Sequence, residues 1–269
     1  MRHAIKLLKR QRIGLIVPSS NITLETELPA LLRRQEARTH QRFSIHSHRL
    51  GLRDVTLESL RAMNQHAEHA GALLGHASVD ALVYGCLIAA LSEGRGAHRL
   101  IEARLQESVS ANGQSTPIVS SAGALINTLK RANYRKVGIL APYHPNLTEK
   151  LVSYFADEGI QVHTTRSLNI TDNLSVGELD PMMLLEELRH FPDSLDALVL
   201  SACVQMPSLE AIAAAEARLD IPVITALTAT TSELLETLGQ TPRIEGAGCL
   251  LNGSRSGKCR DLDLLRRSA

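Results

Sequence analysis

Residues 78–86 read Ser78-Val79-Asp80-Ala81-Leu82-Val83-Tyr84-Gly85-Cys86. Residues 194–203 repeat the pattern as Ser194-Leu195-Asp196-Ala197-Leu198-Val199-Leu200-Ser201-Ala202-Cys203. Each stretch has an acidic lead-in, an apolar run typical of a buried strand, and a cysteine where that strand ends. Two such stretches in one chain indicate two similar halves, each of which contributes one thiol to a shared active site.

Three further segments recur in the same order in both halves. Residues 12–21 are echoed at 136–146, residues 43–50 at 160–168, and residues 116–122 at 221–226. Repeats in a constant order indicate tandem duplication of a whole domain. We therefore predict an N-terminal domain at 1–123, a C-terminal domain at 124–252 whose last helix can pack back on the first domain, and a tail at 253–269. A turn at Gly123 is expected before a helix around Leu125 to Lys130.

Apolar runs of four to six residues alternate with stretches of helical spacing such as Leu57-Leu60-Met63. Alternating strands and helices predict an α/β fold of two domains related by a pseudo-two-fold axis, each a parallel sheet flanked by helices. Ligands of such sheets bind beyond the carboxyl ends of the strands. The active site is therefore predicted in the cleft between the domains. The continuous apolar runs predict the central strands, at 13–17, 81–83, 137–140 and 197–200.

Charge and hydropathy restrict the partners. The 269 residues carry a net charge of +1 and only 3% are aromatic, so the chain offers neither the field nor the stacking surface that nucleic acid requires. No apolar run reaches the roughly 18 to 20 residues that cross a bilayer. The N-terminus is basic but lacks the apolar core of a signal peptide. We expect a cytoplasmic protein with no nucleic-acid or membrane partner.

No metal or cofactor site is predicted. Cys86, Cys203, Cys249 and Cys259 lack the spacing of a zinc site or a disulfide scaffold, and in a reducing cytosol they are expected to be free thiols. His46 and His48 share a strand face without a thiol or carboxylate at ligand spacing. Gly94-Arg95-Gly96 lacks the strand-turn-helix context of a dinucleotide site.

The two repeated cysteines are the strongest functional candidates. A lone buried cysteine is most often a small packing residue, but duplication favours a catalytic role. Helices are expected to begin after Cys86 and after Cys203, and their N-terminal N–H groups would favour thiolates. The neutral polar residues at the strand ends either cap helices or bind a carboxylate, and the pattern leaves both open: Ser19, Ser20, Asn21, Ser120, Ser121, Tyr143, Asn173, Ser201 and Thr225.

Six segments, in order between Arg12 and Leu251, resemble the maleate cis-trans isomerases of the aspartate/glutamate racemase superfamily. They are Pro18-Ser19-Ser20-Asn21 with Glu25-Thr26-Glu27, Cys86-Leu87-Ile88-Ala89, Ser121-Ala122-Gly123-Ala124, Ala141-Pro142-Tyr143, Asp172-Asn173-Leu174, and Ser201-Ala202-Cys203-Val204-Gln205-Met206. The resemblance implies a cofactor-free homodimer that converts maleate, a small dicarboxylate, to fumarate. Within it, Cys86 would be the nucleophile, Cys203 the facing thiol, and Asn21, Tyr143 and Asn173 the carboxylate anchors. Their neighbours Ser19, Ser20, Leu87 and Val204 complete the predicted substrate-binding set.

Two alternatives stay open. Amino-acid racemases of the superfamily carry Asn-Thr after the first cysteine and Thr-His after the second, where this chain has Leu87-Ile88 and Val204-Gln205. Apolar residues cannot hydrogen-bond an α-ammonium group, so a two-cysteine racemase or epimerase of an acidic amino acid is the less favoured reading. The second alternative is a catalytically inactive dicarboxylate-binding protein. The superfamily's arylmalonate decarboxylases lack the first thiol, so Cys86 argues against that activity.

Overall fold

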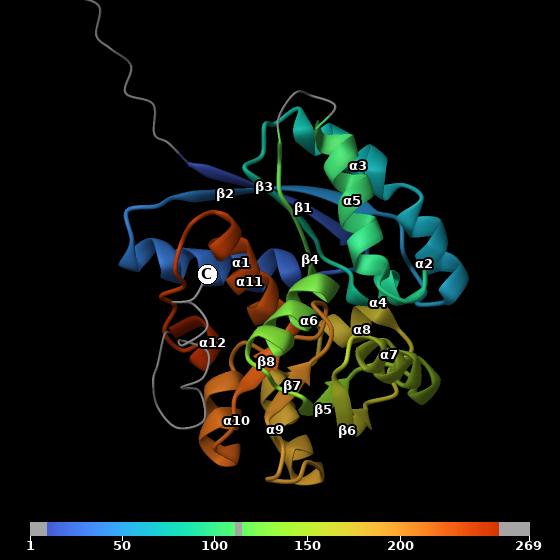
Figure 1. Cartoon of the computed structure of the whole chain (residues 1–269), viewed down its shortest axis with the longest axis vertical. Coiled ribbons are helices and arrows are strands. Elements are labelled where there is room, and N and C mark those ends of the chain that lie inside the picture. Colours follow the sequence, from blue (N-terminus) through green and yellow to red (C-terminus); the bar gives the residue numbers. More distant parts are fainter. Residues whose placement is uncertain (1–9, 111–114, 253–269) are drawn as a thin grey trace, which may run out of the picture.

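The computed structural model describes residues 10–110 and 115–252, and it is built on two four-stranded parallel sheets. The first sheet has the order β2-β1-β3-β4 and the second the order β6-β5-β7-β8. Both halves therefore place their second strand at one edge and their first and third strands in the centre. This confirms the predicted fold class, and Figure 1 shows the first sheet above the second. The strands are β1 (Gln11–Pro18), β2 (Phe43–Leu50), β3 (Ala81–Tyr84), β4 (Ile118–Ser120), β5 (Lys136–Ala141), β6 (Gln161–Ser167), β7 (Ala197–Ser201) and β8 (Val223–Thr225).

The four continuous apolar runs form the central strands, as predicted. All four residues of β3 and all five of β7 are buried, because helices cover both faces of each sheet. The edge strand β6 instead alternates exposed and half-buried residues along most of its length. The apolar runs thus determine which strands lie inside each sheet. Cys86 follows β3, and Cys203 follows β7.

Helices connect the parallel strands. Those of the first half are α1 (Leu24–Arg38), α2 (Leu57–Asn64), α3 (Ala67–Gly75), α4 (Leu87–Leu91), α5 (Ala97–Ser110) and α6 (Ser121–Arg131). Those of the second half are α7 (Pro145–Asp157), α8 (Asn173–Gly177), η1 (Pro181–Met183), α9 (Leu184–Glu187), η2 (Leu188–His190), α10 (Ile212–Leu219), α11 (Ala226–Thr237) and α12 (Cys249–Asn252). In the described part of the chain no helix is both long enough and apolar enough to span a bilayer.

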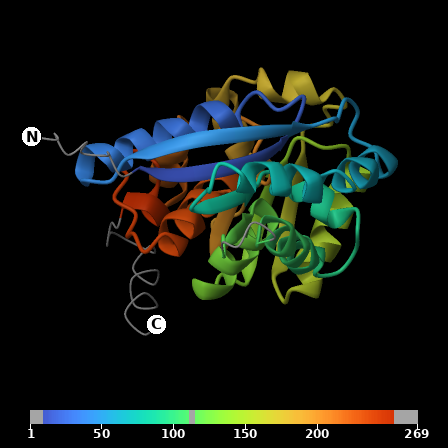
Figure 2. The ribbon, with the colours of Figure 1, turned by 90° about the horizontal axis from the view of Figure 1, so that it is seen from above.

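Helices α6 and α11, each of which follows the fourth strand of its half, pack against each other between the two sheets. Helix α11 also contacts α1, β3 and β4 of the first half. Figure 2 shows this C-terminal segment in red beside the blue segment that contains α1 and β1. The domain limits at 123/124 stay a prediction, and that point falls inside α6.

The expected turn at Gly123 is wrong, because α6 begins directly after β4. The Ser120 hydroxyl accepts a hydrogen bond from the Gly123 N–H at 3.0 Å and so caps the helix. A Cβ atom on Gly123 would lie 2.5 Å from the Glu102 carboxylate. This glycine therefore serves close packing and not a turn.

The expectation of four free thiols is wrong for Cys249, which is disulfide-bonded at the start of α12. That expectation assumed a reducing cytosol. Disulfide formation also depends on the approach of two thiols in space, which sequence spacing does not reveal. Cys86 and Cys203 are free. Cys259 and the predicted tail lie outside the described residues.

Candidate active site

Cys86 and Cys203 line one small buried cavity at the carboxyl ends of β3 and β7. The two cysteines are 5% and 8% exposed. The cavity has a volume of about 20 Å³, which is room for about one water molecule. No side chain on its wall carries a fixed charge. Its wall consists of Pro18, Asn21, Leu52, Val55, Gly85, Cys86, Leu87, Ile88, Tyr143, Asn173, Cys203, Val204 and Gln205.

Cys86 is placed by the glycine before it and the helix after it. A Cβ atom on Gly85 would lie 2.3 Å from a methyl group of Leu24, so a larger residue here would displace that side chain of α1. Cys86 is the N-cap residue of α4. Burial raises the pKa of the Cys86 thiol, and the backbone N–H groups of Ala89 and Ile88 oppose that rise. The predicted helix start after Cys86 is thus confirmed.

Cys203 lies in a different environment, and the predicted helix directly after it is wrong. A turn follows, and α10 begins only at Ile212. The Gln205 N–H donates to the Cys203 sulfur at 3.4 Å. The physical reason for the turn is Pro207, which disfavours helical backbone at Met206 before it.

The protonation of the thiols also differs from the expectation. Burial, with a smaller contribution from charge on Cys203, raises the pKa of Cys86 to about 12 despite the opposing N–H groups. Burial raises the pKa of Cys203 too, although its hydrogen bond from Tyr143 opposes that shift. Desolvation of a charged sulfur outweighs the helix N-terminus in a cavity without fixed positive charge. Both cysteines therefore rest as thiols, and the expected resting thiolates are wrong.

Tyr143, which follows β5, is a hydrogen-bond donor in the cavity. Its hydroxyl forms a hydrogen bond with the sulfur of Cys203. Burial, together with charge on Cys203, raises the pKa of Tyr143 well above its usual range. The phenol therefore stays protonated at neutral pH. It can donate to an anion that enters the cavity.

Asn21 and Asn173 come from opposite halves of the chain and line the same cavity. The side-chain oxygen of Asn21 accepts hydrogen bonds from the N–H groups of Thr23 at 3.0 Å and Leu24 at 2.9 Å. This orientation leaves the Asn21 amide nitrogen as its free donor. The Asn173 amide donates to the Ser20 hydroxyl at 2.6 Å and so joins the halves directly.

The remaining candidates divide into cavity residues and supporting residues. Leu87 and Val204 are part of the wall, whereas Ser19 and Ser20 are not. The Ser19 hydroxyl accepts from the Leu52 N–H at 3.0 Å and so fastens the loop after β2, and Ser20 supports Asn173. Both serines therefore hold cavity residues in place without facing the cavity.

The polar residues at the ends of β4, β7 and β8 lie outside the cavity wall, and Ser120, Ser201 and Thr225 bond locally. The Thr225 hydroxyl accepts from the Thr228 N–H at 3.0 Å and caps α11. Ser120 caps α6, next to the buried Ser121. The Ser201 hydroxyl donates to the Cys203 carbonyl at 2.7 Å. Helix capping and turn stabilisation account for three of them, Ser120, Ser201 and Thr225.

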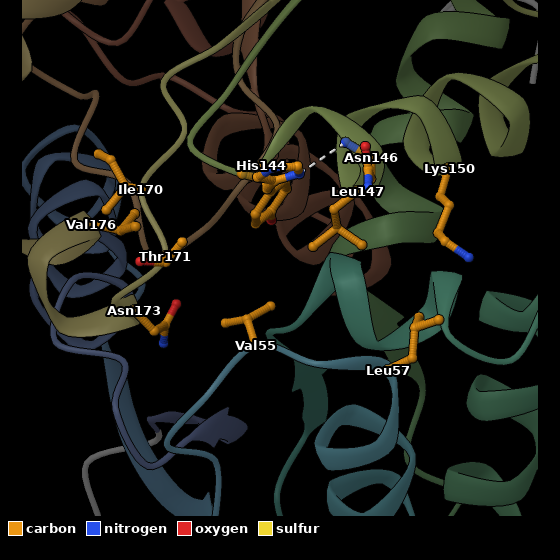
Figure 3. A pocket seen from close by; sticks show the side chains of 11 residues that line it. Val55, Leu57, His144, Asn146, Leu147, Lys150, Ile170, Thr171, Asn173 and Val176 are labelled. Atoms are coloured by element: carbon orange, nitrogen blue, oxygen red, sulfur yellow. Dashed lines mark hydrogen bonds between the residues drawn. The ribbon is translucent and has the colours of Figure 1, made fainter.

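A second, larger pocket of about 220 Å³ adjoins the thiol cavity and shares Val55, Tyr143 and Asn173 with it. Figure 3 shows its side chains. Its walls combine apolar and polar side chains, namely Val55, Leu57, Tyr143, His144, Asn146, Leu147, Lys150, Ile170, Thr171, Asn173 and Val176. The loop that carries Val55 pairs with the loop just before Asn173 through an isolated antiparallel β-bridge of the backbone, between Asp54 and Asp172.

Sequence reasoning missed six wall residues, namely Pro18, Leu52, Val55, Gly85, Ile88 and Gln205. The sequence could have pointed to Gln205 and Ile88, because each stands two residues after a repeated cysteine. Leu52 and Val55 come from the loop after β2, and as apolar loop residues they carried no chemical signal. Among residues 10–110 and 115–252, no group of three or more His, Cys, Asp or Glu side chains could hold a metal ion.

Comparison with known proteins is consistent with this site. The family model described as arylmalonate decarboxylase matches residues 13–251. Maleate isomerase of Alcaligenes faecalis is 44% identical over 248 residues, which cover 91% of this chain and 98% of that protein. A maleate isomerase structure from Pseudomonas putida S16 with maleate is 44% identical, with a TM-score of 0.89 over 91% of this chain and 99% of that one.

A Nocardia farcinica maleate cis-trans isomerase structure adds a chemical observation. It is 37% identical, with a TM-score of 0.87 over 91% of this chain and 100% of that one. In that variant one cysteine is replaced by serine, and a succinylcysteine intermediate is covalently bound. On the extent of these matches, the chain belongs to the arylmalonate decarboxylase family and, within it, to the maleate isomerases.

Proposed function

We propose that this chain isomerises maleate to fumarate without a cofactor, with Cys86 as the nucleophile. The observation that carries the proposal is the pair of free thiols on one cavity with amide and phenol donors from both halves. Relatives at 42% to 44% identity that are maleate isomerases support the substrate. The homodimer and the cytoplasmic location stay predictions.

The chemistry begins with the loss of the Cys86 proton to solvent, which returns a proton to the sulfur after fumarate has left. The thiolate then adds to one alkene carbon, a C–S bond forms, and the π electron pair moves onto the neighbouring carbon and its carboxylate. The former double bond is now single and can rotate. Asn21, Tyr143 and Asn173 are the donors proposed to hold the carboxylates, and a donor aimed at the developing enediolate contributes about 3 kcal/mol. Return of the electron pair expels the thiolate and leaves fumarate.

Cys203 is the proposed proton carrier. Its thiol can protonate the enediolate carbon to give a succinyl thioether, and the resulting thiolate can remove that proton again after rotation, so that no proton is consumed. The succinylcysteine of the Nocardia farcinica variant is the product of such a protonation. Because the adduct persists where another cysteine is missing, it supports a second thiol as the group that removes the proton, while the protonation itself can also draw on another donor.

A cavity of about 20 Å³ is too small for a four-carbon dicarboxylate, since it holds about one water. Substrate binding therefore requires the wall shared with the larger pocket to move. Val55 lies on a loop and is part of that wall. Opening there would join the two spaces.

The pH dependence follows from the raised thiol pKa. Because the pKa of Cys86 is about 12, the reactive thiolate is a minor species that grows about tenfold per pH unit below that value. We expect kcat/KM for maleate, which reports the free enzyme, to rise steeply from about pH 7 to pH 9. Initial rates in buffers of constant ionic strength measure this profile. A flat profile over that range would show that Cys86 is already ionised at rest.

Racemisation is the second candidate, and the cavity disfavours it. An amino acid substrate needs acceptors for its α-ammonium group, but Leu87, Ile88 and Val204 beside the thiols are apolar. A binding protein without catalysis is disfavoured because both thiols are present and free. Separate incubations with maleate, L-aspartate and L-glutamate, analysed by chiral chromatography, distinguish the three. We expect fumarate from maleate and unchanged enantiomers. Racemised aspartate or glutamate with intact maleate would refute the proposal.

A further inference from the structure

We infer that Gln205 is a positioning residue that aligns the two proposed carboxylate anchors, Asn21 and Asn173, across the two halves of the chain. The inference rests on the proposed function, because it assigns Gln205 a role in the binding of that substrate. Gln205 follows Cys203 by two residues and is 3% exposed. Its role is to hold other groups and not to react.

The Gln205 amide bonds the chain on both sides of Asn21. Its nitrogen donates to the Ser20 carbonyl at 3.0 Å, and its oxygen accepts from the Ile22 N–H at 2.9 Å. The backbone before and after Asn21 is thus held by one side chain. Asn21 is 1% exposed and lines the cavity, so a shift of this backbone would move its side chain, which the Thr23 and Leu24 N–H groups also hold.

The same amide nitrogen also holds the other anchor. Its second hydrogen goes to the Asn173 carbonyl at 2.8 Å, so the two donors and the acceptor of this side chain serve three backbone groups. Only an amide offers two donors and an acceptor in this arrangement. A carboxylate would face two carbonyl oxygens, and an apolar side chain would leave all three groups without this partner.

Gly177 packs closely against the Gln205 amide. A Cβ atom on Gly177 would lie 2.6 Å from the Gln205 amide nitrogen and 2.5 Å from a side-chain carbon of Ile22. The Gln205 carbonyl accepts from the Thr23 hydroxyl at 2.6 Å, and its N–H donates to the Cys203 sulfur. Gln205 therefore contacts the second thiol through its backbone, and its side chain bonds Asn173 and both chain neighbours of Asn21.

Loss of the amide should act on substrate binding. A displacement of about 1 Å in a positioned group can cost about a hundredfold in rate. We expect Gln205→Met and Gln205→Glu to raise KM for maleate by about tenfold or more and to lower kcat/KM further. Steady-state kinetics measure both constants, and thermal unfolding confirms that each variant is folded under assay conditions.

Gln35 offers a matched control. It is also a fully buried glutamine with a bridging amide, which donates to the Thr241 carbonyl at 3.0 Å and accepts from the Arg243 N–H at 2.7 Å, but it does not line the cavity. Gln35→Met should lower the unfolding temperature and leave KM within about twofold of wild type, because it removes equivalent bonds elsewhere.

The outcomes separate this inference from the proposed function. A wild-type protein without maleate turnover would refute the function itself. A wild type that isomerises maleate, together with a folded Gln205 variant that keeps the wild-type KM, would refute the positioning role. An equal rise in KM for Gln35→Met would refute it too, since the effect would then come from general destabilisation.

Discussion

Cys86→Ala is expected to lower the rate of fumarate formation by about 10⁴-fold or more, to the limit of detection. Without the sulfur no C–S bond can form, the alkene keeps its π bond, and rotation is blocked. Removal of a nucleophile from a site that acts as a unit costs losses of this order or larger. The measurement is fumarate produced from maleate over hours at high protein concentration.

The variant should still bind maleate, since Asn21, Tyr143 and Asn173 are untouched. Titration calorimetry tests this and shows that the loss is chemical. Cys86→Ser, which keeps the shape of the side chain, should be as inactive, because a serine hydroxyl is far harder to ionise in a cavity that already raises the thiol pKa. Substantial turnover by Cys86→Ala would exclude Cys86 as the attacking group.

Cys203→Ser is expected to stop turnover at a covalent adduct. The serine hydroxyl or a water molecule can still supply the proton that converts the enediolate to the succinyl thioether. A serine hydroxyl cannot easily become the base that removes this proton again, so the adduct on Cys86 should accumulate while fumarate formation falls by about 10² to 10⁴-fold. Intact-protein mass spectrometry after incubation with maleate should show a mass increase equal to one maleic acid. Peptide mapping should place that increase on Cys86.

The double variant Cys86→Ala with Cys203→Ser is the control, and it should show no added mass. An adduct on the double variant would mean that another group reacts with maleate. A Cys203→Ser protein with wild-type turnover and no adduct would show that Cys203 carries no proton in the reaction.

Much of the fold could be predicted because the chain repeats itself. The apolar runs at 81–83 and 197–200 become fully buried central strands, since only a strand covered on both faces carries so continuous an apolar pattern. The turn expected at Gly123 failed because a glycine required for close approach to Glu102 has the same sequence signal as a glycine required for a turn.

Less of the candidate site could be predicted. Both thiols and the anchors follow strand ends, so topology brings Cys86, Cys203, Asn21 and Tyr143 to one cavity. The protonation of the thiols depends on burial and on the absence of charge from the cavity wall, and neither is visible in local sequence. The role of Gln205 depends on three backbone groups from distant segments, which only the folded chain brings together.

Proton NMR of one sample that contains the protein, maleate and L-aspartate in deuterium oxide tests the central claim most directly, because it follows both candidate reactions at once. Addition of Cys86 followed by rotation should convert maleate to fumarate with little deuterium at carbon, while the aspartate α-proton signal persists. Loss of the aspartate α-proton signal, with maleate unchanged, would contradict the assignment of this cavity to cis-trans isomerisation.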